Sequence, residues 1–174
     1  YTERITIDGK EMPEDRLIEY VETLRNTIEK VQATFFEATT CVAFMYFAEE
    51  EVDLAVVETG LGGRLDSTNT IHPILSVITN ISFDHIDVLG NTLRSIAAEK
   101  GGIIKRGTPG VTGASDEVVG EVLREIATKQ GTDILQSNAL AWLIPSSVRP
   151  LAAGVDIRTR SFRIWNVQLG LAGN

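Results

Sequence analysis

The pattern of hydrophobic positions predicts an amphipathic helix near the start of the chain. Apolar residues recur at spacings of three and four from Leu17 to Val31, which is typical of one helical face. Pro13 and the two acidic residues after it favour a helix start, because proline tolerates the first turn and acids favour its positive end. The charged residues between the apolar positions are expected to face solvent.

A second helix is predicted over residues 34–49. Thr34 and Glu37 form a capping-box pattern, in which each side chain can accept a hydrogen bond from the backbone N–H of the other. The residues that follow are apolar on nearly every face, which is typical of a buried helix. Cys41 lies in this run, and we expect it to be a small buried hydrophobic residue.

Short, continuous apolar runs predict strands further along the chain. Residues 54–57 and 75–78 are typical of strands buried on both faces, as in a parallel sheet covered by helices. Alternation of strands with helices then predicts an α/β fold with a mainly parallel sheet flanked by helices. The later elements are predicted as helices over 91–102 and 115–131 and strands over 110–112 and 133–135. Asn91 and Thr92 can start the first of these helices, and residues 115–117, Ser-Asp-Glu, cap the second.

The C-terminal segment differs from the rest of the chain. Residues 155–158 and 162–169 are typical of two strands joined by a short turn. We expect a small antiparallel β appendage at the C-terminal end of the main sheet. The chain opens in one strand-like segment and stops just after another, so we also expect it to be a fragment.

Charge and composition exclude several classes of function. The net charge is −8 without basic clusters, which is unfavourable for nucleic-acid binding. No apolar run approaches the roughly 20 residues needed to cross a bilayer, and the first residues do not form a signal peptide. The only cysteine permits no disulfide within the chain, so we expect a cytoplasmic protein without membrane or nucleic-acid partners.

Candidate chemistry gathers where the predicted strands end. Glu58 follows the first apolar strand and enters a glycine-rich loop, and His85 follows the second. These two side chains offer oxygen and nitrogen ligands for a divalent ion, and Lys100 lies in a helix that returns towards the same region. Each also has an ordinary structural explanation: a strand-end residue, a hydrogen-bonded loop histidine, and a lysine at the negative end of a helix dipole.

Four motifs in order resemble a known family. Residues 58–69, ETGLGGRLDSTN, closely resemble the family stretch EVGLGGRLDATN. Residues 34–37, 76–85 and 96–105 resemble its other motifs, with Gly102 replacing the usual alanine. On these residues the chain resembles folylpolyglutamate synthase, whose bacterial members often double as dihydrofolate synthase, in the Mur ligase superfamily.

The resemblance implies a role for each matching residue. Glu58 and His85 would bind Mg²⁺, and Lys100 would be carbamylated and act in catalysis, since a carbamate is an anion that can hold or orient a hard metal ion. Phe35 or Phe36 could form an aromatic wall for a flat pterin ring, and for at least one of the two we expect simple core packing instead. The implied substrate-binding residues are Thr34, Phe35, Phe36, Arg64, Leu65 and Asp66.

The resemblance also implies a reaction and its reactants. ATP would phosphorylate a carboxylate of dihydropteroate or a folate, and the amine of L-glutamate would then displace phosphate to form an amide. Residues 1–174 would be part of the P-loop-like central domain of a monomeric Mur ligase, without the phosphate-loop segment and the C-terminal ligase domain. The sequence contains no Gly-Lys-Ser/Thr phosphate loop, so we expect the chain alone to be inactive.

Two other functions stay open from the sequence. A Mur-type ligase could add amino acids to a nucleotide-linked cell-wall precursor, although the loop from Arg64 to Asn69 favours a folate. A non-catalytic domain could bind a nucleotide or a partner. The presence together of Glu58, His85 and Lys100 argues against that, because a scaffold needs none of them.

Overall fold

The chain divides into two compact units. The structure is a computed structural model that describes residues 2–149, 152–159, 161 and 163–169. Unit 1 is Tyr1–Ile71 and unit 2 is His72–Asn174. No helix in these described ranges is long and apolar enough to cross a membrane.

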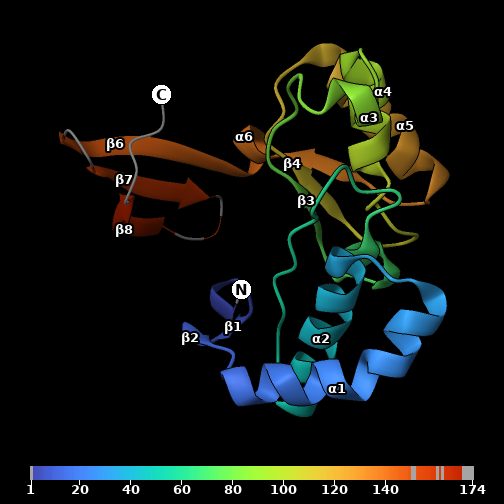
Figure 1. The fold of residues 1–174 in the computed structure, drawn as a ribbon. Helices are drawn as coiled ribbons and strands as arrows, with labels where there is room; N and C mark the ends of the chain where they lie inside the picture. Colours follow the sequence, from blue (N-terminus) through green and yellow to red (C-terminus); the bar gives the residue numbers. More distant parts are fainter. Residues whose placement is uncertain (1, 150–151, 160, 162, 170–174) are drawn as a thin grey trace. The chain divides into compact units, whose positions relative to one another are not determined.

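Unit 1 is mainly helical (Figure 1). Strands β1 and β2 form a short antiparallel hairpin, in which Thr6 pairs with Glu11. The N-terminal hairpin and the two long helices share one hydrophobic cluster, centred on Met12, Tyr20 and Tyr46. The elements of unit 1 are η1 (Thr2–Arg4), β1 (Thr6–Ile7), β2 (Lys10–Glu11), α1 (Glu14–Val31), α2 (Phe35–Glu49) and η2 (Ser67–Thr70).

Helix α1 begins at the predicted place, but its buried face differs from the expected one. Pro13 occupies the N-cap position, as the sequence indicates. Tyr20 is the buried residue of the helix, while the predicted core residues Val21 and Val31 are exposed. Among the described residues, α1 is covered on the side that packs in one cluster with α2 and the N-terminal hairpin, so its apolar stripe is wider than the contact.

Helix α2 has the predicted capping box but is not buried on all sides. Thr34 Oγ1 accepts a hydrogen bond from the Glu37 amide, and the Glu37 carboxylate accepts one from the Thr34 amide. Thr40, Val42 and Tyr46 are buried, whereas Cys41 is exposed. The predictions of a wholly buried helix and a buried cysteine were therefore wrong, because covering the other faces depends on distant segments.

Residues 54–57 do not form the predicted strand. They run as extended chain without a ladder partner, and Val56 is 92% exposed. Apolar composition makes a segment suitable for a sheet, but a strand exists only where a neighbour supplies hydrogen bonds. Among the described residues, no strand lies beside residues 54–57 to pair with them.

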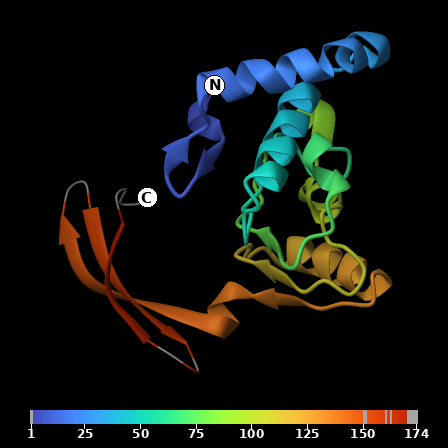
Figure 2. The ribbon, with the colours of Figure 1, turned by 90° about the horizontal axis from the view of Figure 1, so that it is seen from below.

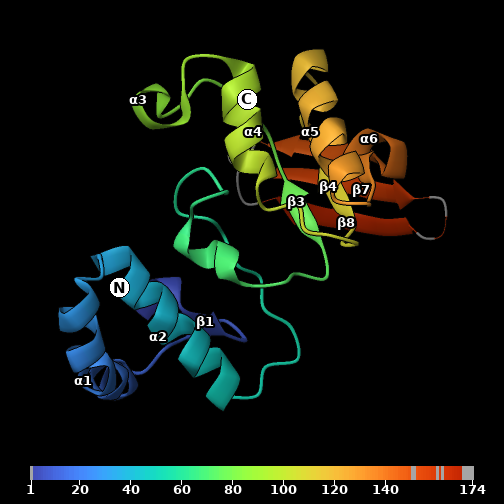
Figure 3. The same ribbon diagram turned by 90° about the vertical axis from the view of Figure 1, so that its right-hand side faces the viewer.

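Unit 2 contains a three-stranded parallel sheet in the order β3-β4-β5. Strands β3 and β4 pair in parallel and are labelled in Figure 3. The register pairs Ile78 with Thr112 and Thr112 with Gln136, so the carboxyl ends of the strands meet at one edge. Helices connect the parallel strands, as βαβ units require. The elements are β3 (Ser76–Ile78), α3 (Ile86–Leu89), α4 (Leu93–Gly101), β4 (Gly110–Thr112), α5 (Glu117–Lys129), β5 (Ile134–Gln136) and α6 (Ser137–Leu140).

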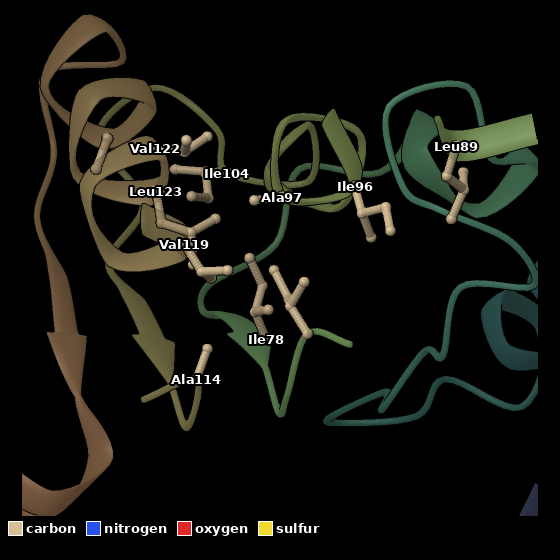
Figure 4. Close-up of a cluster of buried hydrophobic side chains, with 11 residues drawn as sticks. Ile78, Leu89, Ile96, Ala97, Ile104, Ala114, Val119, Val122 and Leu123 are labelled. Carbon is tan, nitrogen blue, oxygen red and sulfur yellow. The ribbon is translucent and has the colours of Figure 1, made fainter. Parts of the chain in front are cut away.

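Helices α4 and α5 form the core of unit 2 together with one face of this sheet. Figure 4 shows Ile96 and Ala97 of α4, Leu123 of α5 and Ile78 of β3 directed into one cluster. Thr92 and Asp116 cap the two helices at the predicted residues. These local signals were correct because each cap needs only neighbours in sequence.

The prediction that the strands are buried on both faces was wrong for β3. Ser76 and Ile78 point into the core, but Val77 between them is 52% exposed. Successive side chains of a strand point to opposite faces, so only the face towards α4 and α5 is fully covered among the described residues.

The C-terminal segment forms an antiparallel sheet, as predicted, but with three strands (Figure 2). Its strands are β6 (Ala141–Arg149), β7 (Ala152–Thr159) and β8 (Arg163–Leu169). The sequence predicted only the last two strands. Pro145, which has no backbone N–H to donate, lies within β6, where it weakens the strand pattern. The parallel sheet with its helices and this antiparallel sheet confirm the predicted fold class.

A polar network joins α1 to α2 inside unit 1. The Tyr20 hydroxyl donates to Glu49 Oε2 at 2.5 Å and accepts from Arg16 Nη2 at 2.8 Å. Arg16 Nη2 also lies 2.7 Å from Glu49 Oε1. The hydrogen bonds from Arg16 and then Tyr20 hold the pKa of the Glu49 carboxyl below its usual range.

This network makes the stability of the α1–α2 contact depend on pH. A carboxylate whose pKa is lowered by folding stabilises the protein above its unfolded pKa, and that stabilisation is lost as pH falls through the folded pKa. We predict that Glu49→Gln in the full-length protein lowers the midpoint temperature of unfolding at about pH 7 and has a smaller effect at about pH 3. The control is Glu50→Gln, since Glu50 is exposed and outside the network. Equal losses for Glu49→Gln at both pH values would contradict the prediction.

Candidate functional site

Unit 1 holds a pocket of about 660 Å³ beside helix α2. One side is formed by α2 side chains that include Phe36, Thr40 and Phe44. The other side is the extended segment 56–60, and the lining also includes Arg4 and Ile5 near the N-terminus and Thr68 of η2. The lining therefore combines apolar and aromatic side chains with several polar ones, among them Arg4 and Glu58, and aromatic walls with placed polar groups are features of small-molecule sites.

Among the described residues that line this pocket, Glu58 alone carries a carboxylate. Its side chain is exposed, and among the described residues it makes no hydrogen bond or ion pair. Both carboxylate oxygens thus stay available to a ligand. The extended backbone at residues 56–60 carries Glu58 to the glycine-rich loop, as the sequence indicates.

Phe36 is fixed at the pocket by a glycine. A Cβ atom placed on Gly60 would lie 2.5 Å from Cζ of Phe36, so the ring packs directly on the glycine backbone. Phe35 is 69% exposed and does not line the pocket. Thr34 caps α2 and uses its hydroxyl in the capping box. Of Thr34, Phe35 and Phe36, which the resemblance implies as substrate-binding residues, Phe36 alone lines the pocket.

The loop after Gly60 closes on itself through Asp66. Asp66 Oδ2 accepts from the Leu61 amide at 2.8 Å, and Asp66 Oδ1 accepts from the Thr68 amide at 3.0 Å. The backbone carbonyl of Arg64 accepts from Asn69 Nδ2 at 3.0 Å. The side chains of Arg64 and Leu65 are exposed, and neither lines the pocket. Asp66 therefore has a structural role in the loop, whatever ligand the loop contacts.

His85 and Lys100 belong to unit 2. His85 is the N-cap of α3 and has a left-handed backbone with φ of 47°. Its Nε2 lies 3.7 Å from Asp84 Oδ2, which is beyond hydrogen-bond distance, while its amide donates to Asp84 Oδ1 at 2.8 Å. Lys100 lies in the last turn of α4, half-buried, and among the described residues its amine has no hydrogen bond or ion pair.

The predicted site residues thus fall into separate groups. Glu58 and Phe36 line one pocket in unit 1, while His85 and Lys100 lie in unit 2. Among the described residues no group of three or more acidic, histidine or cysteine side chains is arranged to hold a metal ion. Sequence reasoning missed Thr68, although a threonine two residues after an aspartate is a common partner for its carboxylate.

Comparison with known proteins identifies the family. Residues 10–174 match the family model of the Mur ligase middle domain. The chain belongs to the Mur ligase middle-domain family. This Mur ligase chain is 42% identical over 180 residues to the dihydrofolate synthase/folylpolyglutamate synthase of Bacillus subtilis, covering 99% of the chain and 42% of that protein. It is 40% identical over 139 residues to the folylpolyglutamate synthase of Lacticaseibacillus casei, covering 76% of the chain and 32% of that protein.

Solved structures agree with the family assignment. A complex of FPGS (folylpolyglutamate synthase) with AMPPCP and folate superposes on the Mur ligase chain with a TM-score of 0.92 at 33% sequence identity. The superposition covers 100% of the chain and 44% of that structure. The chain thus spans less than half the length of each of these relatives.

The contact between Gly60 and Phe36 can be tested by adding one methyl group. We predict that Gly60→Ala displaces the Phe36 ring into the pocket and lowers stability by about 1 kcal/mol or less, because a ring at the end of a flexible side chain can rotate away. A crystal structure and a thermal unfolding curve of the full-length variant measure the two effects. Adding Phe36→Leu should relieve the clash and restore the unfolding temperature. An unmoved ring in Gly60→Ala would contradict the described packing.

Proposed function

We propose that this chain is the central part of an ATP-dependent ligase that joins L-glutamate to dihydropteroate, to folates or to both. The observation that carries the proposal is the similarity over nearly the whole chain to dihydrofolate synthase/folylpolyglutamate synthase, together with a pocket that holds Glu58 and has Phe36 and Phe44 in its wall. The similarity to an FPGS complex with AMPPCP and folate supports ATP and a folate as two of the substrates. Residues 1–174 then form part of the central ATP-binding domain.

The reaction proposed for the full-length protein has two steps. A carboxylate oxygen of the folate attacks the γ-phosphorus of ATP, which forms an acyl phosphate and releases ADP. The amine of glutamate attacks the acyl carbon, loses a proton, and expels phosphate as the amide forms. A flat pterin ring suits the aromatic wall at Phe36, and we assign Thr34, Phe35, Arg64, Leu65 and Asp66 to the same substrate end.

Mg²⁺ is the metal proposed for this reaction. It commonly binds through one or two protein groups together with waters and substrate phosphates. Glu58 fits this demand because its carboxylate has no partner among the described residues, and His85 supplies a ring nitrogen without a hydrogen-bonded carboxylate. When bound, the ion neutralises charge on the phosphates.

Lys100 is proposed as a carbamylated catalytic lysine. Carbamylation needs an amine that is free to take up CO₂, and the Lys100 amine has no partner in the described part of the chain. The resulting anion could orient the metal or its water. We further propose that the full-length protein is a cytoplasmic monomer without nucleic-acid partners, in keeping with its one cysteine and net charge of −8.

The first test is glutamate-dependent ADP release by the full-length protein. We predict that Glu58→Ala and Lys100→Ala each reduce kcat by at least about a hundredfold, because groups that stabilise phosphoryl transfer contribute on that scale. The matched controls are Glu50→Gln and Lys129→Ala, which change exposed charges outside the pocket. Full activity in Glu58→Ala, or equal losses in the controls, would refute the assigned roles.

A second prediction concerns the 174 residues alone. Their sequence has no Gly-Lys-Ser/Thr loop, whose backbone amides and lysine hold ATP phosphates in P-loop enzymes. We therefore expect no ADP release above background from the purified chain under conditions in which the full-length protein turns over. Measurable glutamate-dependent turnover by the 174-residue chain would contradict this.

A further inference from the structure

Thr68 is a buried polar residue at the pocket, with only 6% of its surface exposed. Its hydroxyl donates to Asp66 Oδ1 at 2.6 Å, and its amide donates to the same oxygen at 3.0 Å. Hydrogen bonds to a carboxylate are stronger than those between neutral groups. Thr68 therefore determines the direction in which the Asp66 carboxylate points.

The other oxygen of Asp66 carries this constraint to Gly60. Asp66 Oδ2 accepts from the Leu61 amide at 2.8 Å. That amide belongs to the peptide group that joins Leu61 to Gly60, and a peptide group is planar and rigid. A carboxylate held in one orientation by Thr68 thus holds the Gly60–Leu61 peptide in one place.

Gly60 in turn supports the aromatic ring of the pocket. Its α-carbon packs against Phe36 so closely that an added Cβ would come within 2.5 to 2.9 Å of three ring atoms. A shift of the Gly60–Leu61 peptide would therefore move the ring or open a gap beneath it. Three contacts thus link the Thr68 hydroxyl to the Phe36 ring: Thr68 with Asp66, Asp66 with the Leu61 amide, and Gly60 with the ring.

We propose that Thr68 is a positioning residue that sets the Phe36 ring, and with it the affinity for the pterin-bearing substrate, through Asp66 and Gly60. The proposal rests on the proposed function, because that function assigns the Phe36 pocket to this substrate. Thr68 acts on binding of one substrate only, since no contact in this series involves a group assigned to ATP or to the metal.

The test compares three variants of the full-length protein. Thr68→Val keeps the shape of the side chain and removes the hydroxyl, and Thr68→Ser keeps the hydroxyl. Thr70→Val is the matched control, because the Thr70 side chain makes only a 3.4 Å contact with the Ser67 carbonyl within the same loop. We expect Thr68→Val to raise KM for the folate or dihydropteroate about tenfold, with KM for ATP unchanged, which is the scale of one hydrogen bond to a charged group.

Thr68→Ser should restore the KM for the pterin-bearing substrate, and Thr70→Val should leave it unchanged. If Thr68→Val lowers only the unfolding temperature, or raises both KM values alike, the positioning role is overturned. Should Thr68→Val fail to fold, Asp66→Asn tests the same connection, because it places an amide NH₂ or a weaker acceptor against the Leu61 amide. An unchanged KM for the pterin-bearing substrate in Asp66→Asn would also overturn the role.

Hydrogen exchange separates this inference from the proposed function. Peptides covering residues 60–69 should exchange faster in Thr68→Val than in the wild type, and at the wild-type rate in Thr70→Val, because the Leu61 and Thr68 amides lose a fixed acceptor. Unchanged exchange in Thr68→Val overturns the positioning role whatever the activity. Absence of turnover in a folded wild-type protein overturns the proposed function, while faster exchange in Thr68→Val still supports the control of the loop by Thr68.

Discussion

The carboxylate of Asp66 is the interaction on which the candidate site depends. One oxygen binds the Leu61 amide and the other binds the amide and hydroxyl of Thr68, so a glycine-rich segment that could adopt many conformations is held in one. The closed loop presents Gly60 to Phe36, and Glu58 precedes it at the pocket. The resemblance alone assigns Asp66 to substrate binding, and the structure adds that this side chain organises the loop.

The sequence predicted those features that depend on neighbours along the chain. The caps at Thr34, Thr92 and Asp116 were correct because a capping side chain reaches only two or three residues ahead. Burial was predicted less well. Val56 and Val77 are apolar enough for a covered sheet, yet what covers them depends on segments far away in sequence.

In the candidate site too, features set by sequence neighbours were predictable and features set by distant segments were not. The motif containing Glu58 and Asp66 was recognisable from residue order, whereas the contact of Gly60 with Phe36 joins residues 24 apart and follows only from the packing of the loop against α2. Thr68 had a local signal in its spacing from Asp66, but its burial at the pocket had none. The roles of His85 and Lys100 stay predictions from the family resemblance. The Lys100 amine has no partner among the described residues, and the His85 ring has Asp84 Oδ2 at 3.7 Å without a hydrogen bond to it.

The central claim is that the full-length protein activates a folate carboxylate as an acyl phosphate and joins it to glutamate. The most direct measurement supplies the substrate with its carboxylate labelled with heavy oxygen, together with ATP and glutamate, and analyses both products by mass spectrometry. The account predicts a substrate extended by one glutamate and one labelled oxygen in the released phosphate, because the carboxylate oxygen that attacks ATP leaves with the phosphate. Unlabelled phosphate, or no extended product from a folded protein that binds ATP, would contradict it.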